Sequence, residues 1–268
     1  MLYTPGEIAK NYIDIGKRKA GMPWDKMFLL AVMAGIYIAV AGCGASTAAC
    51  TIGGSAGKLV GACVFPAGLT LVLLAGSELF TGNCLLVIPA LEREISLGAM
   101  LRNWLIVYLG NFAGSVLIAW MAVYSHQLSL FDGQLAAATV NTAVAKVSMP
   151  FFDAFMKGVL CNLLVCLAVW VSFAAKDAAG KVIALFYPIV VFVVCGFEHS
   201  VANMFYCPAG LFALSCPEYA GLLKAEAGVL TWGNFILKNL VPVTLGNIVG
   251  GAVFVGGVYW RVYLRRDR

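Results

Sequence analysis

Six apolar runs occupy most of the chain, and each is long enough to cross a lipid bilayer as an α-helix. A crossing needs about 20 predominantly apolar residues. With 62% hydrophobic and 12% charged residues, the chain carries more apolar surface than a soluble protein of this length could bury. We therefore expect an all-α integral membrane protein with six transmembrane helices. The expected spans are residues 27–47, 58–91, 99–124, 151–175, 181–214 and 238–263.

Lysines and arginines divide unevenly between the two sides that these spans define. One side holds thirteen of them: Lys10, Lys17, Arg18, Lys19, Lys26, Arg93, Arg102, Lys176, Lys181, Arg261, Arg265, Arg266 and Arg268. The other side holds four: Lys58, Lys146, Lys224 and Lys238. Because positive charge accumulates on cytoplasmic loops, we expect both termini in the cytoplasm and a multi-pass protein of the inner (cytoplasmic) membrane.

The first 26 residues predict an amphipathic cytoplasmic helix that begins with a capping box of Thr4 and Glu7 and has Pro5 in its first turn. This helix either lies along the membrane surface or packs on a neighbouring subunit. The six-span domain follows over residues 27–263, and residues 264–268 form a short cytoplasmic tail.

Several partner classes have no support in the sequence. The formal charge of +5 comes without a basic run, so no nucleic-acid partner is expected. The nine cysteines lie mostly in apolar sequence, where a thiol behaves as a small buried hydrophobe. Without a metal-ligand cluster or a cofactor fingerprint, we expect neither metal nor cofactor.

The second and fifth spans are too long for one crossing, and a polar cluster interrupts each of them. The clusters GSELFTGN at 76–83 and GFEHSVAN at 196–203 share the pattern Gly-x-Glu-x-x-x-x-Asn, and the next spans share GNFAGS and GNIVGG. Two halves of three spans each must run in opposite directions, which predicts an inverted repeat of about 27–124 and 151–263. Interrupted helices mark a transport path, because non-helical backbone survives at membrane depth only inside protein or a wet cavity.

The polar residues of this path have structural and functional interpretations. We expect Glu78 and Glu198 to support the helix breaks, either by accepting hydrogen bonds from freed backbone amides or in a protonated form. His199 can exchange a proton near neutral pH or serve a structural role. Lys157 either snorkels to the interface or attracts anions in a vestibule. The glycines of the GN motifs let helices approach closely.

GSELFTGN, KGVLCNLLVCLAVW, GFEHSVANMF and GNIVGG together resemble the signature elements of the formate/nitrite transporter family. The resemblance covers nearly the whole chain. It implies an aquaporin-like fold of six spans, assembly as a homopentamer, and one pore in each protomer. It also implies roles for particular residues. The implied substrate-pathway residues are His199, Thr81, Asn203, Asn162 and Lys157, and the implied constriction and gating residues are Leu79, Phe80, Gly82, Phe65, Leu69 and Phe192.

These residues suggest a mechanism for a channel that passes small monovalent anions of weak acids, with formate preferred. Lys157 concentrates the anion, and Thr81, Asn203 and His199 bind it until protonation, by His199 directly or through water, lets it leave as the neutral acid. We expect residues 79–82 to form a non-helical loop that sets pore width, because Gly82 permits unusual backbone angles. In this loop, Thr81 faces His199. Residues 125–150 are assigned no role.

Three alternatives remain at this stage. Nitrite or hydrosulfide fits the same pore chemistry. A neutral-solute channel of the aquaporin type shares the inverted repeat, but the paired Asn-Pro-Ala motifs of that type are absent from the sequence. A membrane enzyme could use Glu198 and His199 as acid and base, yet no nucleophile motif accompanies them. We therefore expect no enzymatic activity.

Overall fold

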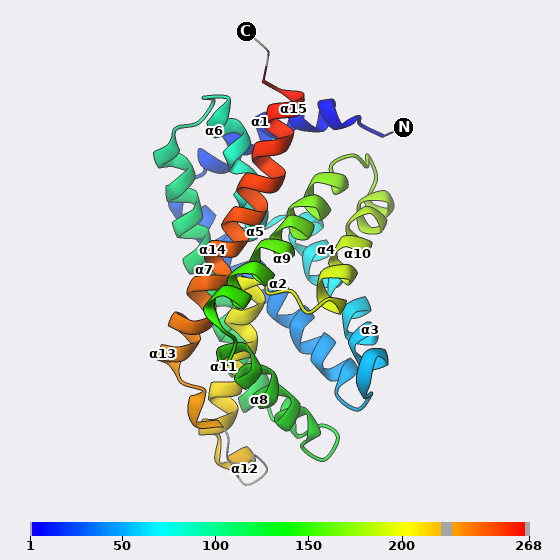
Figure 1. Ribbon diagram of the computed structural model, residues 1–268, viewed down its shortest axis with the longest axis vertical. Helices are drawn as coiled ribbons and strands as arrows, with labels where there is room; N and C mark the ends of the chain where they lie inside the picture. The colour runs from blue at the N-terminus through cyan, green and yellow to red at the C-terminus, as the bar shows by residue number, and fades with distance from the viewer. Residues whose placement is uncertain (1, 221–226, 266–268) are drawn as a thin grey trace.

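A computed structural model describes residues 2–220 and 227–265, and every regular element in these ranges is helical. Lys224, Arg266 and Arg268, three of the cations assigned to sides above, lie outside the described residues. Both ends of the chain lie at one end of a tall helical bundle, which we call the terminal face (Figure 1). Within these described ranges, five helices are long and apolar enough to cross a membrane.

Three spans are continuous helices, as expected. They are α2 (Trp24–Ala49), α7 (Leu97–Tyr124) and α9 (Phe151–Ser172). The sixth span, Trp232–Tyr263, begins several residues before its predicted start. It alternates α-helical and π-helical turns and comprises α13 (Trp232–Asn234), η5 (Phe235–Leu240), α14 (Val241–Ile248), η6 (Val249–Gly257) and α15 (Val258–Tyr263).

The second and fifth spans are interrupted, which confirms the predicted fold class. The fifth consists of α10 (Ala178–Val194) and α11 (Ser200–Ser215), with residues 195–199 between them. The second is built from α3 (Gly54–Val64), α4 (Pro66–Leu71), η1 (Val72–Gly76), α5 (Phe80–Asn83), η2 (Cys84–Leu86) and α6 (Val87–Leu91). Short helices complete the connections: η3 (Gln127–Ser129), α12 (Pro217–Ala220) and η4 (Ala227–Val229).

A glycine with a positive φ angle precedes each break. Gly76 has φ +78° and Gly196 has φ +66°, a region that only glycine adopts without strain. The predicted position of the first break was wrong by a few residues. Residues 77–79 are non-helical, whereas Gly82 lies inside the short helix α5 and has no positive φ. The backbone freedom assigned to Gly82 therefore belongs to Gly76.

The glycines of the GN motifs pack helices together, as predicted. A Cβ on Gly110 would lie 2.5 Å from Ala31 Cβ, and one on Gly246 would lie 2.1 Å from the Phe155 carbonyl oxygen. Neither position has room for a methyl group. These contacts hold α7 against α2 and α14 against α9 at close range.

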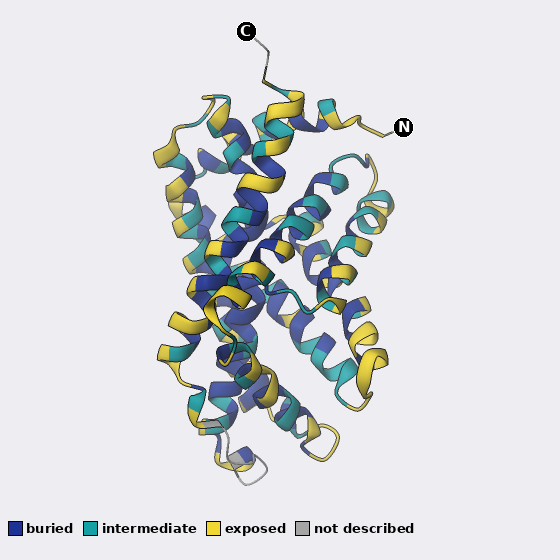
Figure 2. Cartoon of the chain, in the orientation of Figure 1, coloured by how far each residue is buried: buried dark blue, intermediate teal, exposed yellow. Residues whose placement is uncertain are grey.

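Two shorter helices lie at opposite ends of the bundle (Figure 1). Helix α1 (Pro5–Ala20) starts with the predicted capping box and packs on α6 of its own chain, burying Ile8 and Tyr12. Its apolar side therefore belongs to this protomer rather than to a neighbour. Helix α8 (Gln134–Val147) forms within the connection that was assigned no role, and it packs on α11. Buried residues concentrate in the centre of the bundle, while exposed residues follow its outside and its loops (Figure 2).

Replacing Gly76 with alanine should lower stability by about 1 kcal/mol, because an L-residue at positive φ is strained. No other atom lies within 4 Å of the added methyl group, so the variant tests backbone conformation alone. Gly6→Ala is the matched control, since Gly6 sits in α1 with equally open surroundings. Thermal unfolding in detergent measures both variants. Equal melting temperatures for Gly76→Ala and the wild type would contradict the assigned backbone angle.

Candidate functional site

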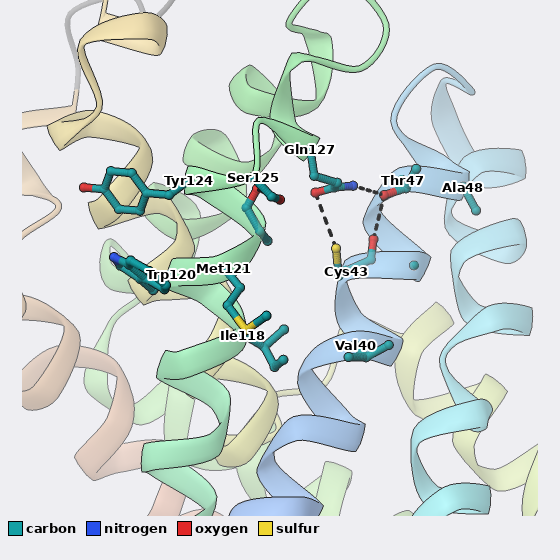
Figure 3. Close-up of a pocket in the computed structure, with 12 residues that line it drawn as sticks. Val40, Cys43, Thr47, Ala48, Ile118, Trp120, Met121, Tyr124, Ser125 and Gln127 are labelled. Carbon is teal, nitrogen blue, oxygen red and sulfur yellow. Dashed lines mark hydrogen bonds between the residues drawn. The ribbon is translucent and has the colours of Figure 1, made fainter.

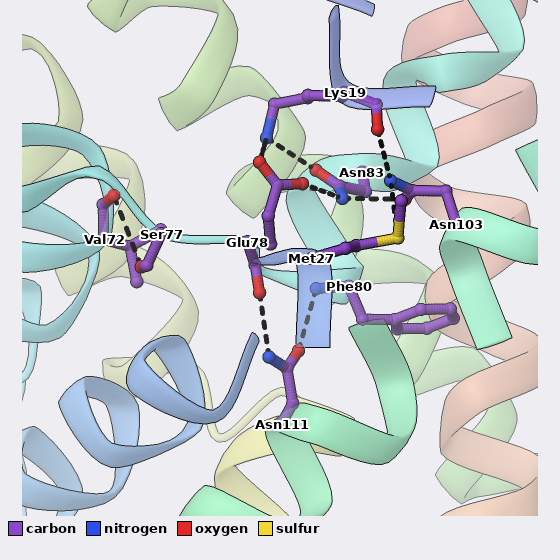
Figure 4. A network of polar contacts seen from close by, with 9 residues as sticks. All are labelled: Lys19, Met27, Val72, Ser77, Glu78, Phe80, Asn83, Asn103 and Asn111. Carbon is purple, nitrogen blue, oxygen red and sulfur yellow. Dashed lines mark hydrogen bonds and ion pairs between the residues drawn. The ribbon is translucent and has the colours of Figure 1, made fainter. Parts of the chain in front are cut away.

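Glu78, the glutamate of the first break, is held in a buried polar network (Figure 4). Lys19 Nζ from α1 lies 2.8 Å from Glu78 Oε1 and also donates to Asn83 Oδ1 at 3.0 Å. Asn83 Nδ2 donates to Glu78 Oε2 at 2.7 Å and to Asn103 Oδ1 at 2.9 Å. Asn103 closes the circuit by donating to the Lys19 carbonyl oxygen at 3.2 Å. The carboxylate is thus paired with one lysine and one amide.

At the second break, residues of the same four types form an equivalent network. Lys146 Nζ from α8 lies 2.9 Å from Glu198 Oε1. Asn203 Nδ2 donates to Glu198 Oε2 at 2.7 Å and to Asn239 Oδ1 at 2.8 Å. Asn239 donates to the Lys146 carbonyl oxygen at 3.1 Å. Each half of the chain therefore builds the same lysine, glutamate and two asparagines around its break.

The backbone freed at the first break is satisfied by the Asn111 side chain. Asn111 Nδ2 donates to the carbonyl oxygens of Ala31 and Glu78 at 2.7 and 2.9 Å. Its Oδ1 accepts from the Phe80 backbone N–H at 2.9 Å. One buried amide therefore ties both sides of the break to α2, where unpaired backbone groups would be costly in lipid.

Asn247 does the same at the second break. Its Nδ2 donates to the Gly158 and Glu198 carbonyl oxygens at 2.8 and 3.0 Å, and its Oδ1 accepts from the Ser200 N–H at 2.9 Å. The expectation that Glu78 and Glu198 accept hydrogen bonds from freed backbone amides was therefore wrong. Their carboxylates pair with lysine and asparagine side chains, and the asparagines of the two GN motifs bind the backbone.

The repeated contacts extend to the two short helices. Lys19 and Lys146 are separated in sequence by the same distance as Ala31 and Gly158, whose carbonyls bind the two GN asparagines. We infer that each repeat includes its lysine-bearing helix, α1 or α8, beyond the predicted limits of 27–124 and 151–263. Sequence reasoning missed these lysines because both lie outside the apolar spans.

His199 and Thr81 meet between the two breaks. Thr81 Oγ1 lies 2.9 Å from His199 Nε2, so Thr81 faces His199 as predicted. His199 is also the N-cap of α11, and its Nδ1 accepts the Ala202 backbone N–H at 3.0 Å. Since Nδ1 carries no proton in that bond, neutral His199 holds its proton on Nε2 and donates to Thr81. The Thr81 hydroxyl hydrogen then remains available to another acceptor.

Two cavities approach this pair from opposite sides. A cavity of about 330 Å³, which we call the outer cavity, is lined by His199, Asn203 and Lys146. Lys146 belongs to α8, at the end of the bundle opposite the terminal face. A cavity of about 30 Å³ lies on the terminal side beside Lys19 and Leu79.

Apolar side chains close the space between the cavities. The Phe65 and Phe192 rings meet edge to face with centroids 5.6 Å apart, and the Phe192 ring stacks on His199 at 6.0 Å. Leu69 and Leu79 are likewise buried and line the small cavity. The structure thus brings together His199, Thr81 and four of the five apolar side chains expected at the constriction and gating positions.

Other predicted site residues lie beside this path rather than across it. Phe80 points toward α7, where its ring centroid is 4.9 Å from that of Tyr108. Asn162 is buried and donates to the Thr81 and Asn247 carbonyl oxygens at 3.2 and 2.7 Å, so it supports the Thr81 turn from behind. Gly82 lines the small cavity.

Lys157 does not join the outer cavity. Its carbonyl oxygen accepts the Glu198 N–H at 3.2 Å, but its half-exposed side chain is not among the residues that line this cavity. Lys58 and Lys146 supply the cations there.

A larger hollow of about 760 Å³ lies between α2 and α7 on the face opposite the termini (Figure 3). Its walls are mostly apolar, with a polar edge where Gln127 Nε2 donates to Thr47 Oγ1 at 2.8 Å. None of the predicted site residues lines it. It is therefore separate from the path through His199.

Two interrupted helices that meet at a polar pair, with cavities on both sides, define a membrane protein of the channel and transporter class. The sequence profile described as Formate/nitrite transporter matches residues 6–261. The chain belongs to the formate/nitrite transporter family, which consists of transporters and channels rather than enzymes.

The chain is similar to individual proteins of this kind over nearly its full length. The chain is 38% identical to formate channel FocA of Escherichia coli (strain K12), covering 99% of this chain and 96% of that protein. It is 40% identical to a probable formate transporter of Methanothermobacter thermautotrophicus, covering 98% and 97%. A solved pentameric formate channel with formate bound superposes with a TM-score of 0.81 at 38% identity, covering 90% of this chain and 98% of that one.

Replacing Asn111 or Asn247 with alanine should destabilise the protein by at least about 2 kcal/mol, because each change leaves one buried N–H and one buried carbonyl at the break without their partner. Exposed Asn141 on α8 is the matched control, and Asn141→Ala should leave stability unchanged. Thermal unfolding in detergent is the measurement. If Asn111→Ala and Asn141→Ala unfold alike, the amide does not hold the break.

Lys146→Met should cost about 3–5 kcal/mol, because it leaves the buried Glu198 carboxylate without its cation. The double variant Lys146→Met/Glu198→Gln should recover much of this loss, since it removes both charges. Exposed Lys238 provides the control Lys238→Met. The single variant Glu198→Gln completes the cycle with the wild type, Lys146→Met and the double variant. Unfolding of these four proteins gives the coupling energy, and additive effects of the two substitutions would argue against the ion pair.

Proposed function

We propose that the protein is a transmembrane channel for small monovalent anions of weak acids, with formate as the preferred substrate. The observation that carries this proposal is the Thr81–His199 hydrogen bond inside a ring of buried apolar side chains. Formate is favoured because relatives at 38–40% identity across nearly the whole chain are named for it. Nitrite is the second candidate, since the family description names it.

The apolar ring selects against charge. Moving an ion into surroundings of low dielectric costs far more than moving the corresponding neutral acid. An anion that reaches Thr81 therefore has to exchange its hydration shell for the available donors and then gain a proton before it passes Phe65, Phe192 or Leu79. Flux should consequently rise as the pH falls, because the neutral acid becomes more abundant.

The proton most simply reaches the anion through water in the outer cavity. Direct transfer from His199 requires an imidazolium with a proton on Nδ1, and that proton would displace the hydrogen bond from Ala202 N–H. We propose that His199 stays neutral and orients Thr81, whose hydroxyl donates to the anion. Asn203 Oδ1 is buried with no hydrogen-bond partner among the described residues, so it can accept from the acid hydroxyl or from water.

The proposal includes the oligomeric state of the protein and its orientation in the membrane. The pentameric relative supports a homopentamer. The Thr81–His199 path within a single chain supports one pore in each protomer. Large apolar side chains such as Leu29, Leu105 and Leu237 are exposed on the bundle, as lipid or a neighbouring subunit would require. The cations near α1, α6 and α15 support a cytoplasmic terminal face in the inner membrane.

His199→Asn should reduce formate flux by about tenfold in liposomes, which corresponds to the loss of one hydrogen bond of about 1.5 kcal/mol. Asparagine is a favourable N-cap, so it can keep the cap of α11 while losing the contact with Thr81. His199→Phe removes both interactions and should also lower stability. A His199→Phe protein that assembles normally and keeps the wild-type rate and pH profile would rule out the role of His199.

A further inference from the structure

Lys58 stands where the outer cavity meets a second cavity. Besides the outer cavity, a cavity of about 450 Å³ lies between the ends of α2 and α3 and helix α8. Four residues line both: Lys58, Thr142, Val193 and Tyr206. Because they share these walls, the second cavity lies directly beside the outer cavity. An ion that enters from the face opposite the termini passes Lys58 before it reaches His199.

The other charges around the outer cavity cancel. Lys146 lies 2.9 and 3.0 Å from the two carboxylate oxygens of Glu198, so this pair contributes little net field. His199 is neutral in the hydrogen-bonding pattern described above. Lys58 has no hydrogen bond or ion pair within the described ranges 2–220 and 227–265. It therefore supplies the uncompensated positive charge among the described residues that line this entrance.

The Lys58 ammonium group also lies close to the break in the fifth span. A Cβ added to Gly196 would be 3.4 Å from Lys58 Nζ, which places the charge directly over the loop that leads to Glu198 and His199. A lysine suits this place, because its ammonium is a mobile point charge on a flexible stem and can release a hydrated anion as readily as it attracts one.

We propose that Lys58 is the anion-collecting residue of the outer entrance, where it concentrates small monovalent anions and sets the affinity for their entry. This inference rests on the proposed channel function and adds a specificity-determining residue to it. The small cavity on the terminal side has a different arrangement, because its lysine, Lys19, is already paired with Glu78. The asymmetry implies that loss of Lys58 impairs entry from the outer face more than exit from the cytoplasm.

The test measures initial rates of formate uptake by intact cells expressing Lys58→Gln, Lys58→Arg or Lys58→Glu in a strain without its own formate transport. Near neutral pH, Lys58→Gln should raise the half-saturating formate concentration at least threefold at about 10 mM ionic strength. The effect should fall below twofold at about 150 mM, because the Debye length shortens from about 30 to about 8 Å. Lys58→Glu should weaken uptake further, and Lys58→Arg should restore it.

Two controls separate this role from folding and from the proposed function. Lys238→Gln removes an exposed lysine on the same face that lines neither cavity, so it should leave uptake unchanged. Oligomer size in detergent should be the same for all variants. Uptake by Lys58→Gln that equals wild type at low ionic strength, or Lys58→Arg as impaired as Lys58→Gln, overturns the inference while the channel function stands. A wild type that passes no monovalent anion overturns both.

Discussion

Backbone groups released inside a membrane must find partners within the protein, and the rest of this structure depends on how that requirement is met. Two spans break at membrane depth, and lipid offers nothing to their free N–H and C=O groups. Asn111 and Asn247 each satisfy two of these groups, one N–H and one C=O, with one side-chain amide. Each amide also donates a hydrogen bond to a carbonyl of the preceding span, at Ala31 or Gly158. The breaks are therefore held in fixed positions. Thr81 and His199 meet as a result.

The charged residues around the breaks keep the path neutral at its centre. Lys19 and Lys146 neutralise Glu78 and Glu198. Each lysine lies on a short helix, α1 or α8, at one end of the bundle. The buried carboxylates therefore need no proton from the transported acid. What remains at the centre is an uncharged donor pair inside apolar walls, which suits a small anion that becomes neutral in transit.

The sequence predicted much of this arrangement and failed at identifiable points. The apolar runs, the shared Gly-x-Glu-x-x-x-x-Asn pattern and the opposed halves predicted the fold class and the two breaks. The resemblance to the family pointed to Thr81 and His199 as the residues that face each other. The roles of Asn111 and Asn247 were not identified from the sequence, although the segments NWLIVYLGN and NLVPVTLGN place asparagines at the same spacing. Helix packing by the neighbouring glycines, Gly110 and Gly246, already explained the motif. Lys146 was missed because a lysine in a connection between spans gives no sign that tertiary folding will bury it. Gly82 was preferred over Gly76 because sequence alone does not reveal φ.

We propose that a charged anion does not pass the apolar layer around Thr81 and His199. The most direct test measures formate entry and internal pH together in liposomes that contain the wild-type protein, while an imposed membrane potential is varied. We expect one proton to be transferred with each formate ion and the flux not to change with the potential. Formate entry that increases with the potential, without accompanying protons, would contradict it.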